Sequence, residues 1–133
     1  MIRRDYILRL VADLAEFLAK LLKLSRENLP EAIEQAKQRV CDLYEMSFDE
    51  FLNMDDDKLV KPDWPLQTGL ADKLGEFLFE MGKMAADQND FELREKLFLK
   101  ALYLFQQAEL ADKSYSFDRI VTIGQIKGML GTE

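Results

Sequence analysis

Apolar residues over residues 5–24 recur at steps of three and four, which is the period of an α-helix. One row comprises Ile7, Leu10, Leu14, Phe17, Leu21 and Leu24, and a second row comprises Leu8, Val11, Ala15, Leu18 and Leu22. Together the two rows are wider than the apolar arc of an ordinary surface helix. We therefore expect this helix to be covered from two sides, either by its own domain or by a second copy of the chain.

Capping signals divide the next part of the chain into a second helix and a short third one. Asn28 is a candidate N-cap for a helix that runs to about Met46, because its side chain can accept a free N–H group of the first turn. Ser47 and Glu50 have the spacing of a capping box, which predicts a short helix directly afterwards. The first two helices are so close in the chain that we expect an antiparallel hairpin.

Three further helices are predicted in the second half of the chain. Apolar residues recur at helical spacing over residues 68–88, 91–110 and 117–130. No segment shows the sustained alternation of apolar and polar residues that is typical of a strand. The sequence therefore predicts an all-α fold of stacked helical hairpins, with about five helices plus a short helix in the central connection.

The length of 133 residues fits a single all-helical domain. We expect an N-terminal hairpin over residues 1–46, an acidic connection over residues 47–67, and a second hairpin plus a terminal helix over residues 68–133. Residues 55–60 of the connection can form a turn of helix. Trp64 stands between two prolines, and we expect it to pin the connection to the body of the protein; the alternative is a role in stacking on a bound peptide.

Two glycines interrupt the predicted helix over residues 68–88. Gly75 and Gly82 are seven residues apart and therefore lie on one face of that helix. Each costs about 1 kcal/mol of helix propensity relative to alanine. This cost is explained if another helix approaches closely at both positions.

The segment from Leu78 to Leu104 resembles a tetratricopeptide (TPR) repeat, a helix–turn–helix unit of 34 residues. The matching positions are Leu78, Met81, Gly82 and Ala85 in the first helix, Asn89, Asp90 and Phe91 in the turn, and Phe98, Lys100, Ala101 and Leu102 in the second helix. The first-helix pattern returns at Ile120, Ile123 and Gly124. The whole chain, which opens with Arg4, Asp5 and Tyr6, is also similar to small bacterial helical proteins of no assigned function.

The TPR resemblance implies a binding surface. In TPR proteins the first helices line a concave face that binds an extended peptide or a partner helix. The positions of this chain that correspond to that face are Glu76, Phe79, Lys83, Asp87, Val121 and Gln125. Phe79 lies off the main apolar row, so it is either exposed or covered by the last helix, and we expect it to be covered because large aromatic side chains are usually buried.

The charge of the chain disfavours two classes of partner. There are 18 Lys and Arg residues against 25 Asp and Glu residues, which gives a net charge of −7. Binding to a nucleic acid backbone requires clustered positive charge, and the only such cluster is Arg3, Arg4 and Arg9. Charges interrupt every long apolar stretch, so no membrane span is predicted. We therefore expect a cytoplasmic protein that binds neither nucleic acid nor membrane.

Residues for catalysis and metal binding are sparse. The chain has no histidine, which removes the commonest general base and metal ligand. Cys41 is the only cysteine and is interpreted as a half-buried apolar side chain. The acidic run from Asn53 to Asp57 lacks the glycine and the glutamate that an EF-hand loop requires, and the carboxylate pairs Glu76–Glu80 and Glu92–Glu95 are interpreted as solvated helix faces. We expect no cofactor, no metal site and no enzymatic activity.

Two functions are consistent with this sequence. The first is a protein–protein interaction module that binds an unidentified partner and forms a homodimer through its first helix, whose second apolar row would be buried between the copies. The second is a regulatory domain that binds a small ligand between its third, fourth and fifth long helices. The side chains expected to line that pocket are Phe79, Met84, Phe98 and Tyr103.

Overall fold

The computed structural model of the protein describes residues 2–64, 69–111 and 116–131, and within them it confirms the all-α fold. This described part contains six α-helices, one 3₁₀ turn and no strand. The helices are α1 (Ile2–Glu27), α2 (Leu29–Tyr44), α3 (Phe48–Asn53), α4 (Leu70–Asp87), α5 (Phe91–Ala111) and α6 (Phe117–Leu130), and the turn is η1 (Asp56–Lys58). The start predicted for the third long helix, Thr68, lies outside the described residues.

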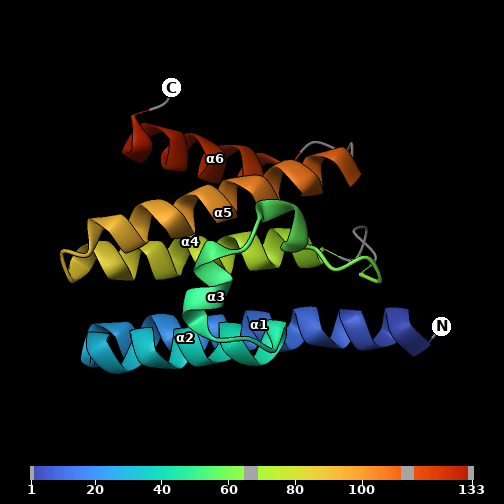
Figure 1. The fold of residues 1–133 in the computed structure, drawn as a ribbon, viewed down its shortest axis with the longest axis horizontal. Coiled ribbons are helices and arrows are strands. Elements are labelled where there is room, and N and C mark those ends of the chain that lie inside the picture. The colour runs from blue at the N-terminus through green and yellow to red at the C-terminus, as the bar shows by residue number, and fades with distance from the viewer. Residues whose placement is uncertain (1, 65–68, 112–115, 132–133) are drawn as a thin grey trace.

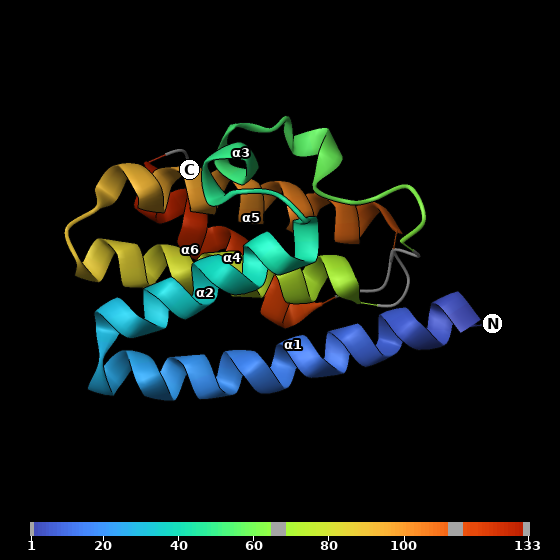
Figure 2. The same ribbon diagram turned by 60° about the horizontal axis from the view of Figure 1, so that its bottom comes forward.

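The long helices are stacked in layers. The α1–α2 hairpin forms one side of the molecule, the α4–α5 hairpin lies next to it, and α6 lies on the far side of α5 (Figure 1). α3 and η1 cross one face of the two hairpins. Helix α1 packs against both α2 and α4, as the view in Figure 2 also indicates. The wide apolar surface of α1 is therefore covered from two sides, and the cover comes from its own chain.

Side-chain caps begin three of the helices, and those of Asn28 and of the Ser47–Glu50 box were predicted. The Asn28 side chain accepts a hydrogen bond from the backbone N–H of Glu31 at 3.2 Å. Ser47 and Glu50 form the complete capping box of α3. The Ser116 hydroxyl accepts the backbone N–H of Arg119 at 3.3 Å and begins α6. These local interactions explain why the observed helix starts agree closely with the sequence pattern.

The two glycines of α4 allow α5 to approach closely, as predicted. A Cβ atom placed on Gly82 would lie 2.6 Å from the ring of Phe98. A Cβ atom placed on Gly75 would lie 2.8 Å from the ring of Phe105. Both phenyl rings are fully buried. Each ring therefore occupies the space that a side chain on α4 would need.

A buried lysine fastens the central connection to α5. Lys100 is only 4% exposed. Its Nζ atom donates hydrogen bonds to the backbone oxygen of Met54 and to Oδ1 of Asp56, both at 3.1 Å. A buried ammonium group needs such partners, because an unpaired charge in the interior is costly. The connection is thus held at the start of η1.

Aromatic packing fastens the end of the same connection to α2. Trp64 is buried, and its ring centroid lies 5.8 Å from that of Tyr44. The Tyr44 hydroxyl donates a hydrogen bond of 2.7 Å to the backbone oxygen of Leu59. Trp64 therefore pins the connection to the body, as expected, and its ring is not exposed for stacking on a peptide.

We expect Gly82→Ala to lower the free energy of unfolding by about 1–3 kcal/mol, because the new methyl group overpacks the site against the Phe98 ring. The matched control is Gly124→Ala in α6, where an added Cβ meets no atom within 4 Å. That substitution should raise stability by up to about 1 kcal/mol through helix propensity. Urea unfolding followed by circular dichroism measures both values. Equal effects of the two substitutions would contradict the close approach of α4 and α5.

Burial raises the pKa of Tyr44 well above the ordinary value of 10.0. The folded state therefore favours the protonated phenol, and the stability that this group contributes is present below about pH 10 and is lost as pH rises above it. We expect the free energy of unfolding to fall less steeply between pH 9 and pH 11 in Tyr44→Phe than in the wild type. Tyr44→Phe should also cost about 1 kcal/mol at pH 7 by removing the hydrogen bond to Leu59. If the free energy of unfolding fell with pH equally steeply in Tyr44→Phe and in the wild type, burial of the Tyr44 phenol would not contribute to the pH dependence of stability.

Candidate functional site

An open groove lies where α1, α4 and α6 end and α5 begins, at one end of the molecule (Figure 1). Its volume is about 480 Å³. Side chains of all four helices contribute to it: Leu22, Ser25, Glu80, Lys83, Met84, Ala86, Asp87, Arg94, Phe98 and Met129. The groove brings together residues that are more than 100 positions apart in the sequence, which is possible because the hairpins are stacked.

The floor of the groove is apolar. Met84 and Phe98 are buried there, while Leu22 is half-buried and Met129 is exposed at the edge. The Phe79 ring lies against this floor, with its centroid 5.3 Å from that of Phe98. Methionine side chains adapt to different shapes, so a floor that combines them with an aromatic ring can accept an apolar side chain.

The rim of the groove is charged. Lys83 forms an ion pair of 3.0 Å with Glu80, and its Nζ atom also lies 4.6 Å from the centre of the Phe79 ring. The guanidinium group of Arg94 lies over the rings of Phe91 and Phe98, at 5.2 and 5.7 Å. Asp87 is exposed on the same rim. Charges of both signs thus surround an apolar floor, an arrangement typical of protein-binding surfaces.

Arg94 carries a hydrogen-bond donor that has no partner. Its Nε atom is buried, and no acceptor contacts it among the residues that the structure describes. A buried donor without a partner costs about 1–3 kcal/mol. Arg94 lines the groove, but its Nε atom is enclosed, so a ligand in the groove reaches this donor only if the Arg94 side chain moves.

The structure brings only some of the predicted binding residues into the groove. Lys83 and Asp87 line it. Glu76 lies in a neighbouring depression and pairs with Lys73 at 2.6 Å. Val121 and Gln125 are exposed on α6 but line neither of these two depressions.

Phe79 is covered rather than exposed, as expected. Its side chain is only 5% exposed, and its ring packs on Phe98 of α5. It therefore supports the floor of the groove from below and offers little surface to a partner.

Sequence reasoning missed Leu22, Arg94 and Met129, which come from three different helices. One signal could have indicated Arg94, because TPR repeats carry a small residue at that position and this chain carries a long cation. The apolar residues Leu22 and Met129 gave no such signal, since each also fits an ordinary core pattern.

An ion pair joins α6 to α4 near the starts of both helices, in a separate depression from the groove. Arg119 is 5% exposed, and it donates two hydrogen bonds to the Asp72 carboxylate at 2.7 and 2.6 Å. This two-pronged geometry is stronger and more directional than a single hydrogen bond. The pair joins elements that are 47 residues apart in the sequence.

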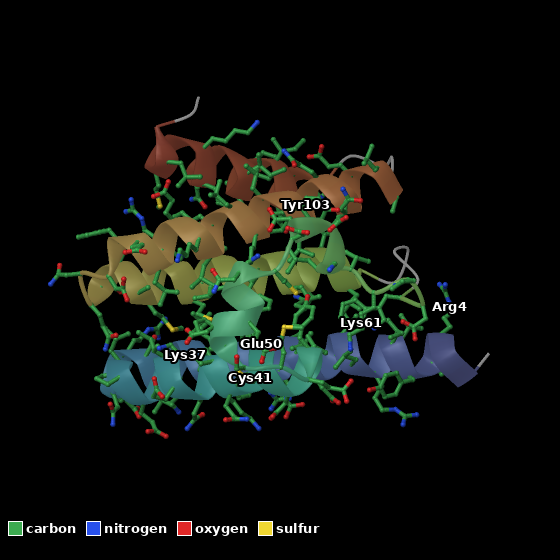
Figure 3. All side chains as sticks on the ribbon, in the orientation of Figure 1. Arg4, Lys37, Cys41, Glu50, Lys61 and Tyr103 are labelled. Carbon is green, nitrogen blue, oxygen red and sulfur yellow. The ribbon has the colours of Figure 1, made fainter. Side chains whose placement is uncertain are left out.

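The single cysteine of the chain does not line the groove. Cys41 is half-buried on α2 (Figure 3), and burial together with the neighbouring Asp42 carboxylate raises the pKa of its thiol, which disfavours the nucleophilic thiolate. Within residues 2–64, 69–111 and 116–131 no three His, Cys, Asp or Glu side chains gather in a way that could hold a metal ion. None of the helices in these ranges is both long and apolar enough to cross a membrane.

Comparisons with protein family models, with curated proteins and with solved structures find no match to this chain. No activity can therefore be carried over from a relative. The function has to be argued from the groove and from the exposed helix faces.

We expect Asp72→Ala to lower the free energy of unfolding by about 1–3 kcal/mol, because it removes two charge-assisted hydrogen bonds from the buried Arg119 guanidinium group. Amide hydrogen exchange of α6 should accelerate more than that of α4 or α5. The control is Glu92→Ala, which removes an exposed ion pair with Lys96 and should cost less than about 0.5 kcal/mol. If α6 exchanged at the wild-type rate in Asp72→Ala, the pair would not hold this helix.

Proposed function

We propose that this protein is a non-enzymatic interaction module that binds a segment of a partner protein in the groove between α1, α4, α5 and α6. The observation that carries the proposal is the combination of an apolar floor with the charged side chains of Lys83, Asp87 and Arg94 around it. An apolar side chain of the partner would lie against Leu22 and Met129, which are the accessible apolar side chains of the groove, and a carboxylate of the partner would pair with the Arg94 guanidinium group on the rim.

The TPR resemblance supports the same location. In that interpretation α1, α4 and α6 are the first helices of successive units, and these are the helices that line the binding face of TPR proteins. Two of the four helices around the groove, α4 and α6, are those on which the binding residues were expected. Lys83 and Asp87 are the expected binding residues that lie in it.

A small-ligand regulatory domain is the second candidate. The groove volume of about 480 Å³ lies within the range of about 300–1,000 Å³ that is typical of small-ligand sites. Of the four side chains expected to line such a pocket, Met84 and Phe98 do so, whereas Phe79 lies against the floor and Tyr103 lies on α5 outside the groove (Figure 3). A peptide is favoured because the groove is open, and a small ligand would keep much of its surface in water.

Self-association through the first helix stays a prediction. The apolar rows of α1 are largely covered by α2 and α4, which leaves Tyr6 and Leu8 as exposed apolar side chains near its start. Helix α1 therefore offers a small surface for a second copy. The cytoplasm stays the proposed location, since a chain with one cysteine needs no oxidising compartment to form disulfides.

Affinity capture from native lysate tests the groove. We expect a partner that the wild type captures to be reduced at least about tenfold by Lys83→Glu and by Met129→Asp, because a loss of about 1.4 kcal/mol corresponds to that factor. Both side chains line the groove and are partly exposed, so the variants should keep their helical circular dichroism.

The matched control is Lys96→Glu. Lys96 resembles Lys83 in exposure, at 45% against 41%, and both lysines form an ion pair with a glutamate of their own helix. Lys96 lies outside the groove, so its substitution should leave capture unchanged. Capture of the same partner by all three variants at wild-type levels would reject the groove as the binding site. Displacement of that partner by a small molecule from the lysate would favour the second candidate.

A further inference from the structure

Helix α6 is apolar on its outer face as well as on its inner face. Its inner face carries Ile126, which is fully buried, and the ion-paired Arg119. Its outer face carries Phe117, Ile120 and Val121, which are 65%, 45% and 40% exposed. A surface helix normally has polar residues opposite its buried face, and a helix that is apolar all round is normally covered all round. Figure 1 shows α6 as the outermost helix of the stack, with no other helix on its outer side.

The same outer face contains an open space. A Cβ atom placed on Gly124 would meet no atom within 4 Å. Phe117 is seven residues before Gly124, so both positions lie on one face of α6. An exposed phenyl ring and an unoccupied glycine position are thus two turns apart on one helix.

The contact between α4 and α5 shows how a phenyl ring packs over a helical glycine in this chain. There Phe98 and Phe105, seven residues apart, lie over Gly82 and Gly75, which are also seven residues apart, in an antiparallel hairpin. If two copies of α6 pair antiparallel about a two-fold axis, Phe117 of each copy lies over Gly124 of the other. Ile120 of each copy then lies opposite Val121 of the other, at the centre of the contact.

We propose that a second copy of this chain docks on the outer face of α6 through this reciprocal pairing of Phe117 and Gly124. A two-fold contact requires a self-complementary surface, and α6 supplies both the ring and the space for it. Charge points to the same face. Each copy carries a net charge of −7, so two copies repel one another, and the repulsion is smallest where few charged side chains face each other. Phe117, Ile120, Val121 and Gly124 are uncharged, and Asp118 is the acidic residue beside them on α6.

The size of the contact sets the expected affinity. A single pair of 14-residue helices is smaller than a standard interface of about 800 Å² per partner, which predicts a weak, reversible dimer. We expect a dissociation constant in the micromolar range, corresponding to about −6 to −8 kcal/mol. The contact leaves the groove free, because Met129 is the one α6 residue that lines it.

Sedimentation velocity from about 5 to about 500 μM tests this pairing, since the range brackets a micromolar dissociation constant. The wild type should convert from monomer to dimer over this range. Gly124→Phe should weaken the dimer at least about tenfold, because it opposes one ring with another. The double variant Phe117→Gly with Gly124→Phe should dimerise again, since it exchanges ring and space between the two positions. This rescue distinguishes the two-fold pairing from any other contact that involves α6.

Three further variants complete the test. Gly124→Ala should weaken the dimer about tenfold while making the monomer more stable, so loss of folding cannot explain the effect. Phe91→Ala removes a phenyl ring of similar exposure, 53%, from α5 and should leave the dimer unchanged. Leu8→Ala separates this pairing from self-association through α1: the dimer should be unchanged, whereas a dimer that Leu8→Ala weakens and Gly124→Phe does not would form through α1 instead.

Each of three results would overturn the proposal. These are a wild type that stays monomeric at 500 μM, a Gly124→Phe variant that dimerises like the wild type, and a folded double variant that stays monomeric. If the double variant does not fold, the Gly124→Ala variant provides the test. A dimer dissociation constant of Gly124→Ala equal to that of the wild type would reject the pairing.

Discussion

The contact of two phenyl rings with two glycines is the interaction on which this structure depends. Each glycine costs about 1 kcal/mol of helix propensity. Full burial of a phenylalanine side chain contributes about 1.5–3 kcal/mol. The burial of each ring therefore outweighs the helix propensity lost at the glycine below it, and the folded hairpin is favoured. Because Phe98 and Phe105 lie directly over Gly82 and Gly75, α4 and α5 are brought close together and their register is set. Phe98 also forms the floor of the groove, so the same packing that stabilises the hairpin positions the candidate binding site.

The helices could be predicted from the sequence because each carries its own local signals. Asn28, Ser47 and Ser116 cap the helices that follow them, and the apolar rows mark the face that each helix buries. The path of the central connection could not be predicted in the same way. It depends on Lys100, which reaches Met54 and Asp56 across 46 and 44 residues of sequence, and no local pattern encodes such a partner.

The candidate site was only partly predictable for a related reason. Spacing within α4 places Lys83 and Asp87 on one face, and both line the groove. Which part of α6 reaches the groove depends on how that helix packs on α5 and on the Arg119–Asp72 pair that joins it to α4. As a result Met129 lines the groove, while Val121 and Gln125 do not. Arg94 and Leu22 become neighbours of these residues only when the hairpins are stacked.

The groove and the outer face of α6 have different consequences for binding. The groove combines an apolar floor with a charged rim, whereas the outer face of α6 exposes the apolar side chains of Phe117, Ile120 and Val121. An antiparallel pairing of two α6 helices near Phe117 and Gly124 would cover the apolar side chains and leave Met129 uncovered. The pair would then present two grooves, one toward each end. A partner with two binding segments could occupy both, and the second segment would bind at the high effective concentration that the first one creates. A weak dimer whose grooves each bind with low affinity can therefore bind such a partner with high overall affinity, because each copy supplies one of the two sites.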